Sequence, residues 1–426
     1  MVTPEQVFTP RAPVGEDMYA ARRYEALEDR VRNALAEQGA QVVLYGETGV
    51  GKTSLVNHLA RGVKMVRIEC GPSFDLMLNA AIAQVRPERD VDSTHTESRN
   101  AEGGASLGPL KAGIEAGHSH ARRREPVPVG IAPEAVQALE GSGVRLLFFD
   151  NFENLQGTTH ERDTTRALAH LLKSLADRAN ENPHALKAVV AGIPSASEEL
   201  ISLDQATARR TAQIEVPRMP RDELDQILGR GERKLRISFA GHARHLILSY
   251  SDGFPYYTHL LALHCARRVL SDGRNEVTLP DFDDALDEIL AGCDLTLRSQ
   301  YNRAAETSGQ VRARKSIMEA VASMNDNEVT FKQIRTAFLA AHSGYGNDPN
   351  RLNFLSTAIK PLKDEYGILV DRGHPKSRRN AYRFRNPLMR AYVRLRMRKE
   401  SLGRAGIWDP MQGFATFSTA PETTTS

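Results

Sequence analysis

The sequence predicts an α/β fold in which a parallel sheet with helices on both faces is followed by a helical domain and a small α+β domain. In the first half of the chain, short apolar segments alternate with segments of helical periodicity, which is the pattern of strand–helix–strand units. From residue 217 to about 293 the strand pattern stops, and helical segments separated by Gly, Asp and Pro follow. A glycine-rich loop near residue 46, between an apolar strand and a helix, indicates what the sheet holds.

This loop has the spacing G-x-x-x-x-G-K-T, between a predicted strand at 41–45 and a helix that opens at Lys52. Gly49 and Gly51 let backbone N–H groups turn toward phosphate oxygens, and the helix N-terminus adds its positive end. Lys52 can reach the β- and γ-phosphates, and the Thr53 hydroxyl can ligate Mg²⁺. The flanking strand and helix favour a phosphate-binding P-loop over a glycine-rich turn with a chance lysine. The predicted nucleotide-binding residues of the loop are Gly46, Glu47, Thr48, Gly49, Val50, Gly51, Lys52, Thr53 and Ser54.

The apolar segment LLFFD, residues 146–150, predicts a second strand of the site. It ends in Asp150, whose carboxylate would lie beside the P-loop and hold Mg²⁺ through a water. Glu153, three residues later, could polarise an attacking water as a general base. Its alternative role is that of a helix N-terminal carboxylate or an ion-pair partner. The guanine-reading motif N-K-x-D does not occur in the sequence, which argues against a GTPase.

The composition is that of a soluble globular protein of two or three domains, with 426 residues, 41% of them hydrophobic and 26% charged. Cys70, Cys265 and Cys293 lie far apart, which argues for a reducing compartment without structural disulfides. The apolar runs are too short to span a bilayer, and the N-terminus has acids and prolines where a signal peptide needs an apolar stretch. We therefore expect a cytoplasmic protein with no membrane contact.

The expected domain division has five parts. Residues 1–16 are Pro-rich and extended, and residues 17–216 form the α/β domain, with a long polar insertion at about 86–128. Residues 217–293 form the helical domain. Residues 294–403 contain three predicted helices and two strands joined by the basic turn 374–379, which is the outline of a winged helix. Residues 404–426 are polar and expected to be disordered.

The P-loop, the strand ending in D-x-x-E, the AGIP segment after the fourth strand, the helical domain and the winged-helix outline together resemble a known group of proteins. They are similar to AAA+ ATPases of the origin-recognition and STAND groups, over about residues 7–398. The P-loop and Asp150 are the most specific parts of this resemblance. It implies that the nucleotide is ATP, bound with Mg²⁺, and that the helical domain is a lid beside it.

The resemblance also implies three further sites. Such proteins place an arginine that acts on a neighbouring subunit just before the last strand of the sheet, where this chain has Arg209 and Arg210. Two arginines that cap a helix C-terminus are the alternative. Pro255, in the G-x-P of SDGFPYY, resembles the lid motif over the nucleotide base, although a Gly-Phe-Pro turn between helices is common. Arg22 matches the arginine of a segment near the adenine, although Ala21 replaces the usual glycine.

The sequence departs from the family pattern at several catalytic positions. Origin-recognition ATPases have Asp-Glu at the end of the strand, where this chain has Asp150 and Asn151. The polar residue expected after the fourth strand is not obvious, since Ser195 is a poor candidate, and only His259 is found at the lid position where relatives have an arginine. These departures favour slow turnover, and a switch over a motor.

The C-terminal charge is skewed. Residues 371–404 contain twelve Lys or Arg against two Asp or Glu, and such a patch attracts the phosphates of double-stranded DNA. Arg-rich segments also dock onto acidic protein surfaces or onto their own ATPase domain. The last helix alternates arginine with Leu, Tyr and Val, so part of it must pack inward.

These observations predict a Mg-ATP-binding and hydrolysing AAA+/STAND-like ATPase that acts as a nucleotide-dependent switch on a separately encoded protein partner. Arg209 or Arg210 would complete a neighbour's site if the protein forms a homo-oligomer. One alternative is a DNA-binding initiator or loader that uses the basic winged helix. The other is an ATP-binding regulatory module with little or no hydrolysis.

Overall fold

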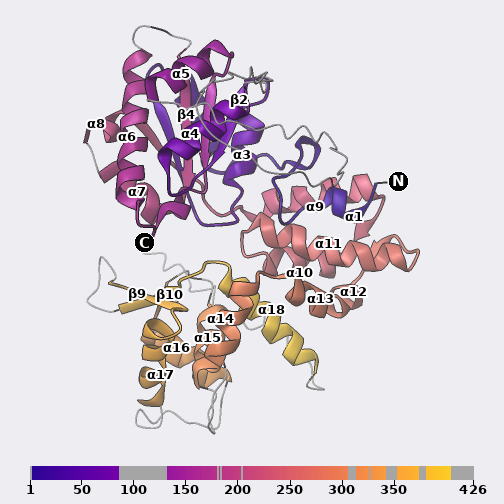
Figure 1. Cartoon of the computed structure of the whole chain (residues 1–426). Helices are drawn as coiled ribbons and strands as arrows, with labels where there is room; N and C mark the ends of the chain where they lie inside the picture. Colours follow the sequence, from indigo (N-terminus) through magenta and orange to yellow (C-terminus); the bar gives the residue numbers. More distant parts are fainter. Residues whose placement is uncertain are drawn as a thin grey trace, which may run out of the picture.

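The computed structural model describes residues 2–85, 132–179, 185–202, 205–305, 313–324, 328–341, 353–373 and 380–403, together with Asn182 and Asp326. Figure 1 shows an α/β part, a helical part beside it and a C-terminal part that lies against the helical part. The predicted insertion at 86–128, the basic turn at 374–379 and the polar tail at 404–426 lie outside the described residues.

The α/β part is built on a parallel sheet, as the sequence predicts. Its five strands follow the order β2-β3-β4-β1-β5, so β4 lies between β1 and β3. The carboxyl ends of β1 and β3 therefore open at the same edge, where ligands of open parallel sheets bind. The strands are β1 (Gln41–Tyr45), β2 (Met65–Glu69), β3 (Leu146–Asp150), β4 (Lys187–Gly192) and β5 (Thr211–Glu215).

Helices cover both faces of this sheet because side chains alternate between the faces along each strand. Val42 and Leu44 of β1 are buried with α2 (Leu27–Ala36) and α3 (Lys52–Leu59). The intervening Val43 belongs to a separate core on the opposite face. The helices of that second face are α4 (Phe74–Ala83), α5 (Ala132–Gly141), α6 (Glu161–Arg178) and α7 (Pro194–Ser202).

The helical part contains one more helix than the sequence suggests. The segment LPDFDDALDEILAG forms two helices instead of one, because the first ends at Asp284 and the next begins at Leu286. Two-residue strands β6 (Ser238–Phe239) and β7 (Glu276–Val277) pair in parallel beside them. The five helices are α9 (Arg221–Leu235), α10 (Gly241–Tyr250), α11 (Pro255–Ser271), α12 (Leu279–Asp284) and α13 (Leu286–Gly292).

The N-terminal segment, expected to be extended, includes a one-turn helix, α1 (Pro4–Val7), and docks on the helical part. Val7 and Phe8 are fully buried. The Phe8 ring lies so close to α9 that a Cβ on Gly231 would be only 2.2 Å from it, so Gly231 is needed for this packing. Apolar burial, which the proline content of the segment obscures, therefore fixes residues that the sequence pattern leaves extended.

The C-terminal part has the order of elements expected from the sequence, with α14 and β8 in addition. Strands β8, β10 and β9 form a three-stranded antiparallel sheet in that order. The elements are α14 (Leu295–Ala305), α15 (Ala313–Ser323), β8 (Val329–Thr330), α16 (Phe331–Ala341), α17 (Asn353–Asp364), β9 (Leu369–Gly373), β10 (Asn380–Phe384) and α18 (Met389–Leu402). No helix in the described ranges is long and apolar enough to cross a membrane.

The basic helix α18 directs much of its charge into the protein. Arg390, Arg394 and Arg398 are 7%, 5% and 8% exposed. Each of these arginines pairs with an acid of the helical part: the first two with Asp252 and the third with Asp283. The skewed composition of 371–404 therefore does not translate into a basic surface along this helix.

Candidate nucleotide-binding site

The P-loop connects β1 to α3 in a conformation that requires its glycines. Gly46 passes so close to β5 that a Cβ there would lie 2.4 Å from the carbonyl oxygen of Val216. Gly49 and Gly51 have φ angles of +86° and +95°, which side chains other than glycine rarely adopt. Gly51 is also the N-cap of α3, so the loop and the positive end of a helix face the same space.

Lys52, the first residue of α3, is buried and folds back onto the loop. Its Nζ donates hydrogen bonds to the carbonyl oxygens of Gly46, at 2.8 Å, and Glu47, at 3.2 Å. Burial lowers the pKa of Lys52, and the nearby carboxylates of Glu153, Asp150 and Glu47 oppose this shift. The ammonium group thus has neutral carbonyl partners, which an anionic phosphate can replace.

The two predicted metal ligands lie in contact. The Thr53 hydroxyl donates to Asp150 Oδ2 at 2.8 Å, across the width of β4. Asp150 is fully buried at the end of β3, and its Oδ1 accepts the backbone N–H of Asn151 at 3.1 Å. A hydroxyl and a carboxylate beside a phosphate-binding loop are the hard oxygen donors that Mg²⁺ prefers. The residues present therefore fit a magnesium ion bound together with a triphosphate.

Asp150 has a third partner that the sequence analysis did not identify. Arg67, on the neighbouring strand β2, places Nη2 2.7 Å from Asp150 Oδ2. Arg67 stands two residues before the end of β2, and nothing in the local sequence marks it as a site residue. Only the pairing of β2 with β3 brings it to the carboxylate.

Glu153 lies in the short 3-10 helix Phe152–Leu155 after β3, and one of its carboxylate oxygens has no partner among the described residues. A Cβ built on Gly192, at the end of β4, would lie 3.4 Å from this oxygen, Glu153 Oε2. It would also lie 3.5 Å from the hydroxyl of Ser197, which is buried and likewise has no partner within the described ranges. Two buried polar groups without partners at the edge of a phosphate site are suited to hold a water.

Ser197 was not predicted from the sequence, which offered Ser195 as a weak candidate. The Ser195 hydroxyl instead accepts a hydrogen bond from Gln156 at 3.3 Å, on the protein surface. Ser197 lies two residues, or about half a turn, further along α7, so its side chain points to the opposite face of the helix and is buried. The helical register after Pro194 is the signal that could have identified it.

Arg22 is a buried link between three segments. Its guanidinium donates to the carbonyl oxygens of Val50, at 2.8 Å, and Pro217, at 2.7 Å, and pairs with Glu223 of α9 at 3.1 Å. It also lies beside Gly51, since a Cβ on that glycine would be 3.8 Å from Nη1. Arg22 thus joins the P-loop to the start of the helical part.

Pro255 begins α11 and lies next to the P-loop. A Cβ on Gly51 would be 3.9 Å from Pro255 Cγ. The preceding Gly253 has a φ of +82°, and a Cβ there would meet Arg218 at 2.7 Å, so glycine is required in this turn. The G-x-P segment therefore places the N-terminal end of a helix beside the loop.

The two arginines near β5 differ in their surroundings. Arg210 donates two hydrogen bonds to Asp177 Oδ1, at 2.7 and 3.0 Å, and is thereby bound to α6. Arg209 is exposed, and the structure gives it no partner in the part of the chain that it describes. Both lie in α8 (Gln205–Arg210), the short helix that leads into β5.

His259 is buried between α11 and the N-terminal segment, where its role is structural. It is buried on α11, and its Nδ1 accepts the backbone N–H of Thr9 at 3.2 Å. Burial lowers the pKa of His259 to about 4, so the ring is neutral at neutral pH. His259 therefore holds the N-terminal segment and carries no charge at neutral pH.

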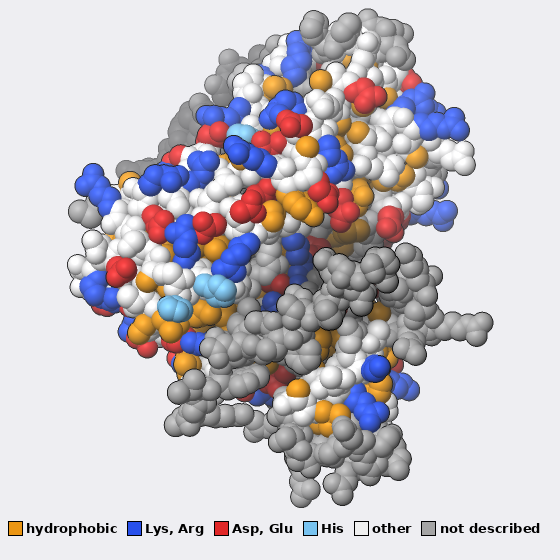
Figure 2. All heavy atoms as spheres, turned by 180° about the vertical axis from the view of Figure 1, so that it is seen from behind, with side chains coloured by type: hydrophobic (Ala, Val, Ile, Leu, Met, Phe, Trp, Pro, Cys, Tyr) orange, Lys and Arg blue, Asp and Glu red, His pale blue; other side chains and the backbone are white. Residues whose placement is uncertain are grey.

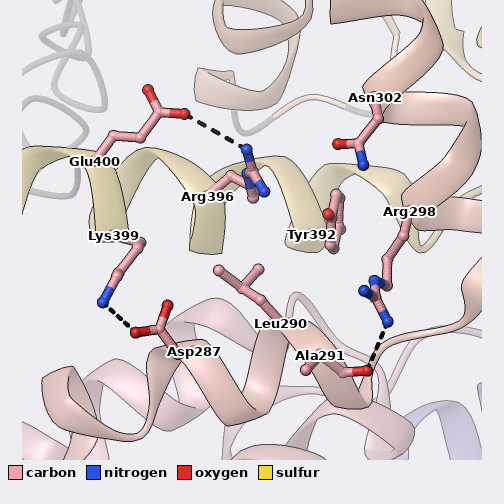
Figure 3. Close-up of a pocket in the computed structure, with 9 residues that line it drawn as sticks. All are labelled: Asp287, Leu290, Ala291, Arg298, Asn302, Tyr392, Arg396, Lys399 and Glu400. Atoms are coloured by element: carbon pink, nitrogen blue, oxygen red, sulfur yellow. Dashed lines mark hydrogen bonds and ion pairs between the residues drawn. The ribbon is translucent and has the colours of Figure 1, made fainter.

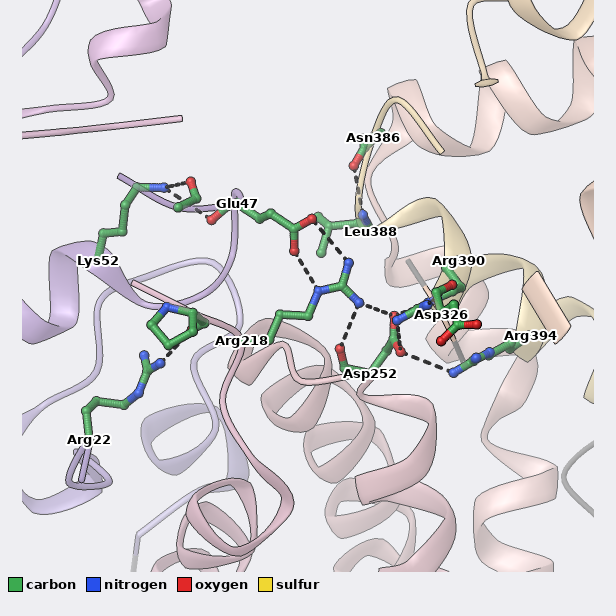
Figure 4. A network of polar contacts seen from close by, with 12 residues as sticks. Arg22, Glu47, Lys52, Arg218, Asp252, Asp326, Asn386, Leu388, Arg390 and Arg394 are labelled. Atoms are coloured by element: carbon green, nitrogen blue, oxygen red, sulfur yellow. Dashed lines mark hydrogen bonds and ion pairs between the residues drawn. The ribbon is translucent and has the colours of Figure 1, made fainter. Parts of the chain in front are cut away.

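A chain of ion pairs leads from the P-loop to α18 (Figure 4). Arg218 donates to both carboxylate oxygens of Glu47, at 2.6 and 3.2 Å, and to Asp252 at 2.9 Å. Asp252 accepts two hydrogen bonds from Arg390, both at 2.7 Å, and one from Arg394 at 3.2 Å. We call these five residues the relay. Three successive ion pairs of the relay thus connect the P-loop side chain of Glu47 to Arg390 of the C-terminal helix.

The C-terminal part also touches the P-loop directly. A Cβ on Gly49 would lie 3.4 Å from Cδ2 of Leu388 and 3.5 Å from Cβ of Tyr256. The carbonyl oxygen of Leu388 accepts the hydroxyl of buried Tyr257 at 2.9 Å. The loop is thus in contact with α11 and with the residue before α18 at once.

A separate cavity of about 320 Å³ lies between α13, α14 and α18 (Figure 3). Its cations already have internal partners: Lys399 pairs with Asp287, and Arg298 donates to the carbonyl oxygen of Ala291. Arg396 lies 4.0 Å from Glu400. We assign no ligand to this cavity.

The fold and the P-loop geometry define a P-loop NTPase. A model of the family Novel STAND NTPase 1 matches residues 15–344, and the chain belongs to this family. The resemblance inferred from the sequence is thereby confirmed.

Two solved structures of low sequence identity share the fold. The Walker-type ATPase of Pyrococcus abyssi is similar with a TM-score of 0.53 and 17% identity, covering 91% of this chain and 99% of that one. The ORC2 protein of Aeropyrum pernix, in its ADPNP–ADP complexes, is similar with a TM-score of 0.51 and 14% identity, covering 93% and 98%. A search of curated proteins by sequence gives no match.

Proposed function

We propose that this STAND NTPase binds Mg-ATP, hydrolyses it slowly, and uses nucleotide occupancy to change how its C-terminal part is held against the P-loop. The changed arrangement would be read by a separately encoded protein partner. The observation that carries this proposal is the relay, because it connects Glu47 of the loop to Arg390 of α18 through buried and half-buried ion pairs.

ATP binding is supported by the geometry of the loop residues 46–54. Their N–H groups and the start of α3 suit phosphate oxygens, and Lys52 can exchange two carbonyl partners for the β- and γ-phosphates. Bound Mg²⁺ would neutralise phosphate charge. Thr53 and Asp150 would hold it, directly or through water.

Hydrolysis is supported by Glu153 and Ser197. Glu153 would accept the proton of a water attacking the γ-phosphate, and Ser197 would orient that water, since both have unpartnered polar atoms around Gly192 among the described residues. No described cation occupies the lid position of relatives, because His259 is buried and neutral. Arg209 of a second copy would supply such a charge if the protein assembles. Slow turnover by the monomer follows.

The partner is proposed to be a protein, and two observations on charge support this choice over DNA. Arg390, Arg394 and Arg398 are engaged by acids of the helical part and are unavailable to phosphates. On the face shown in Figure 2, basic and acidic side chains are interspersed and do not gather by sign. The basic turn 374–379, on which the DNA alternative now depends, lies outside the described residues.

Equilibrium binding and single-turnover assays test the enzymatic part of this proposal. Wild-type protein should bind a fluorescent ATP analogue with Mg²⁺ and release phosphate slowly. Lys52→Ala should abolish binding, because the variant lacks the cation that meets the β- and γ-phosphates. Lys64→Ala, at an exposed lysine that donates to the carbonyl of Ser142, is the matched control and should bind normally. Binding without any phosphate release, alone and at concentrations that allow assembly, would instead support the non-hydrolysing alternative.

A further inference from the structure

The charge of Asp150 is balanced by an arginine that comes from outside the P-loop. Asp150 is fully buried, whereas the side chain of Arg67 is 40% exposed and reaches it from the surface. Lys52 does not pair with this carboxylate, because its ammonium is hydrogen bonded to loop carbonyls. Among the described residues, the cation that pairs with Asp150 is Arg67, whose Nη2 lies 2.7 Å from Asp150 Oδ2. The charge of buried Asp150 is thus balanced by a side chain that is itself partly exposed to solvent.

The position of this guanidinium overlaps the region that a divalent ion would use. Thr53 Oγ1 and Arg67 Nη2 both contact the same oxygen of Asp150, Oδ2, at 2.8 and 2.7 Å. A metal held by Thr53 and Asp150 would lie within a few ångströms of the guanidinium. Two positive charges at that separation repel each other strongly in a partly buried site. Arg67 and the metal therefore cannot both be fully bound to Asp150.

The guanidinium of Arg67 is also able to move away from Asp150. The backbone of Arg67 is fixed in β2, but its side chain is 40% exposed, so the guanidinium can turn into water without disturbing the core. Glu69, whose carboxylate is 3.9 Å from Arg67 Nη2 and more than half exposed, offers it an acidic neighbour outside the site. Withdrawal of Arg67 would leave Asp150 buried without a cation, which is unfavourable unless a metal replaces it.

We propose that Arg67 is a resident competitor of Mg²⁺ at Asp150, and that it sets the concentration of Mg²⁺ needed to load the nucleotide site. In the absence of nucleotide the guanidinium balances Asp150. When a triphosphate brings the metal, the guanidinium is exchanged for it. This inference rests on the proposed Mg-ATP site and adds a specificity residue to it, since Arg67 would favour metal that arrives with nucleotide over free metal.

The test is the Mg²⁺ dependence of nucleotide binding, measured with a fluorescent ATP analogue at fixed concentration. Arg67→Gln removes the competing charge, and the Mg²⁺ concentration for half-maximal binding should fall about tenfold relative to wild type. The control is Arg32→Gln, which removes an exposed arginine that pairs with Asp29 on α2 and should leave the Mg²⁺ dependence unchanged. Arg67→Lys, which keeps a positive charge, should stay closer to wild type than Arg67→Gln.

Two results would overturn the proposal. If Arg67→Gln is folded and has the Mg²⁺ dependence of wild type, Arg67 is only a structural partner of Asp150. If Arg67→Gln is unfolded in EDTA, addition of Mg²⁺ alone should restore it, and failure to do so would also contradict exchange between the two cations. Absence of Mg²⁺-dependent nucleotide binding by the wild-type protein would refute the proposed ATP site itself, and is distinguishable from both.

Discussion

Arg218 donates to both carboxylate oxygens of Glu47 in the P-loop, at 2.6 and 3.2 Å. The same guanidinium pairs with Asp252, which receives Arg390 and Arg394 from the C-terminal helix. Asp252 has a φ of +53°, in the left-handed region that few non-glycine residues adopt. Asp252 thus has an uncommon backbone conformation and pairs with three arginines, so we expect its substitution to lower the free energy of unfolding.

Asp252→Asn should destabilise the protein substantially. It removes the carboxylate with which Arg390 and Arg394 both pair, and loss of one partner of a buried ion pair typically costs about 3–5 kcal/mol. The measurement is urea unfolding monitored by circular dichroism. Asp287→Asn is the matched control, because Asp287 also pairs with α18, through Lys399, but is 73% exposed. The control should change the free energy of unfolding by less than about 1 kcal/mol. Equal losses in both variants would mean that the relay contributes no more than a surface pair.

Glu153→Gln should bind ATP but release phosphate at least about tenfold more slowly than wild type, since the amide cannot accept the proton of the attacking water. Ser197→Ala should slow the same step while leaving binding intact, because it removes one of the two buried polar atoms near Gly192. Ser195→Ala, at the surface position bonded to Gln156, is the control and should turn over normally. Wild-type rates in Glu153→Gln would place the general base elsewhere.

The stability of the helical part should decrease in mild acid because of His259. Its pKa is about 4 in the folded protein, below the ordinary value of 6.5, so the unfolded chain binds the proton more readily between these values. The stabilisation is fully present above pH 6.5 and is lost as the pH falls to about 4. The loss can reach about 3 kcal/mol. His259→Gln keeps an acceptor for the N–H of Thr9, and the difference in unfolding free energy between wild type and this variant should shrink across that pH interval. A difference that does not depend on pH would contradict the buried neutral ring.

The alternative function, DNA binding through the basic turn, predicts salt-dependent binding of duplex DNA. If the basic turn contacts phosphates, Arg378→Ala with Arg379→Ala should weaken duplex binding equally on all sequences, and each lost contact should lower the log–log salt slope by roughly 0.9. We expect instead no salt-dependent retention of duplex DNA by wild-type protein at low ionic strength. Retention that the double substitution removes would revive the alternative.

The sequence predicts the P-loop and the parallel sheet correctly because both depend on local patterns. The spacing of Gly46 to Thr53 fixes the loop, and largely apolar segments of five or six residues define the strands. The packing of α18 could be predicted only in part. Its alternation of arginine with apolar residues indicates that one face of the helix is buried, but it does not identify the acids that pair with the arginines. Asp252 lies 138 residues before Arg390, and a pairing over that separation leaves no local signal.

The site shows the same division. Asp150 and Thr53 were expected to meet, and they do, because the P-loop and a strand ending in an acid form one chemical unit. Arg67 and Ser197 could not be identified from the sequence. The pairing of β2 with β3 brings Arg67 to the site, and the helical register of α7 determines which face Ser197 occupies. Sequence reasoning is strongest where a motif carries the chemistry, and weakest where packing supplies a single side chain.

The central claim, that nucleotide occupancy is transmitted from the P-loop through the relay to α18, is tested most directly by hydrogen exchange. Amide exchange of residues 385–403 would be measured with and without saturating Mg-ATP, in wild type and in Glu47→Gln, which lacks the charge that pairs with Arg218. We predict that ATP changes the protection of α18 in wild type. The change should be lost in Glu47→Gln, although this variant should still bind ATP, because the loop contacts phosphate through its backbone and the side chain of Glu47 is engaged by Arg218. Protection of α18 that is the same with and without bound ATP in wild type would contradict the account.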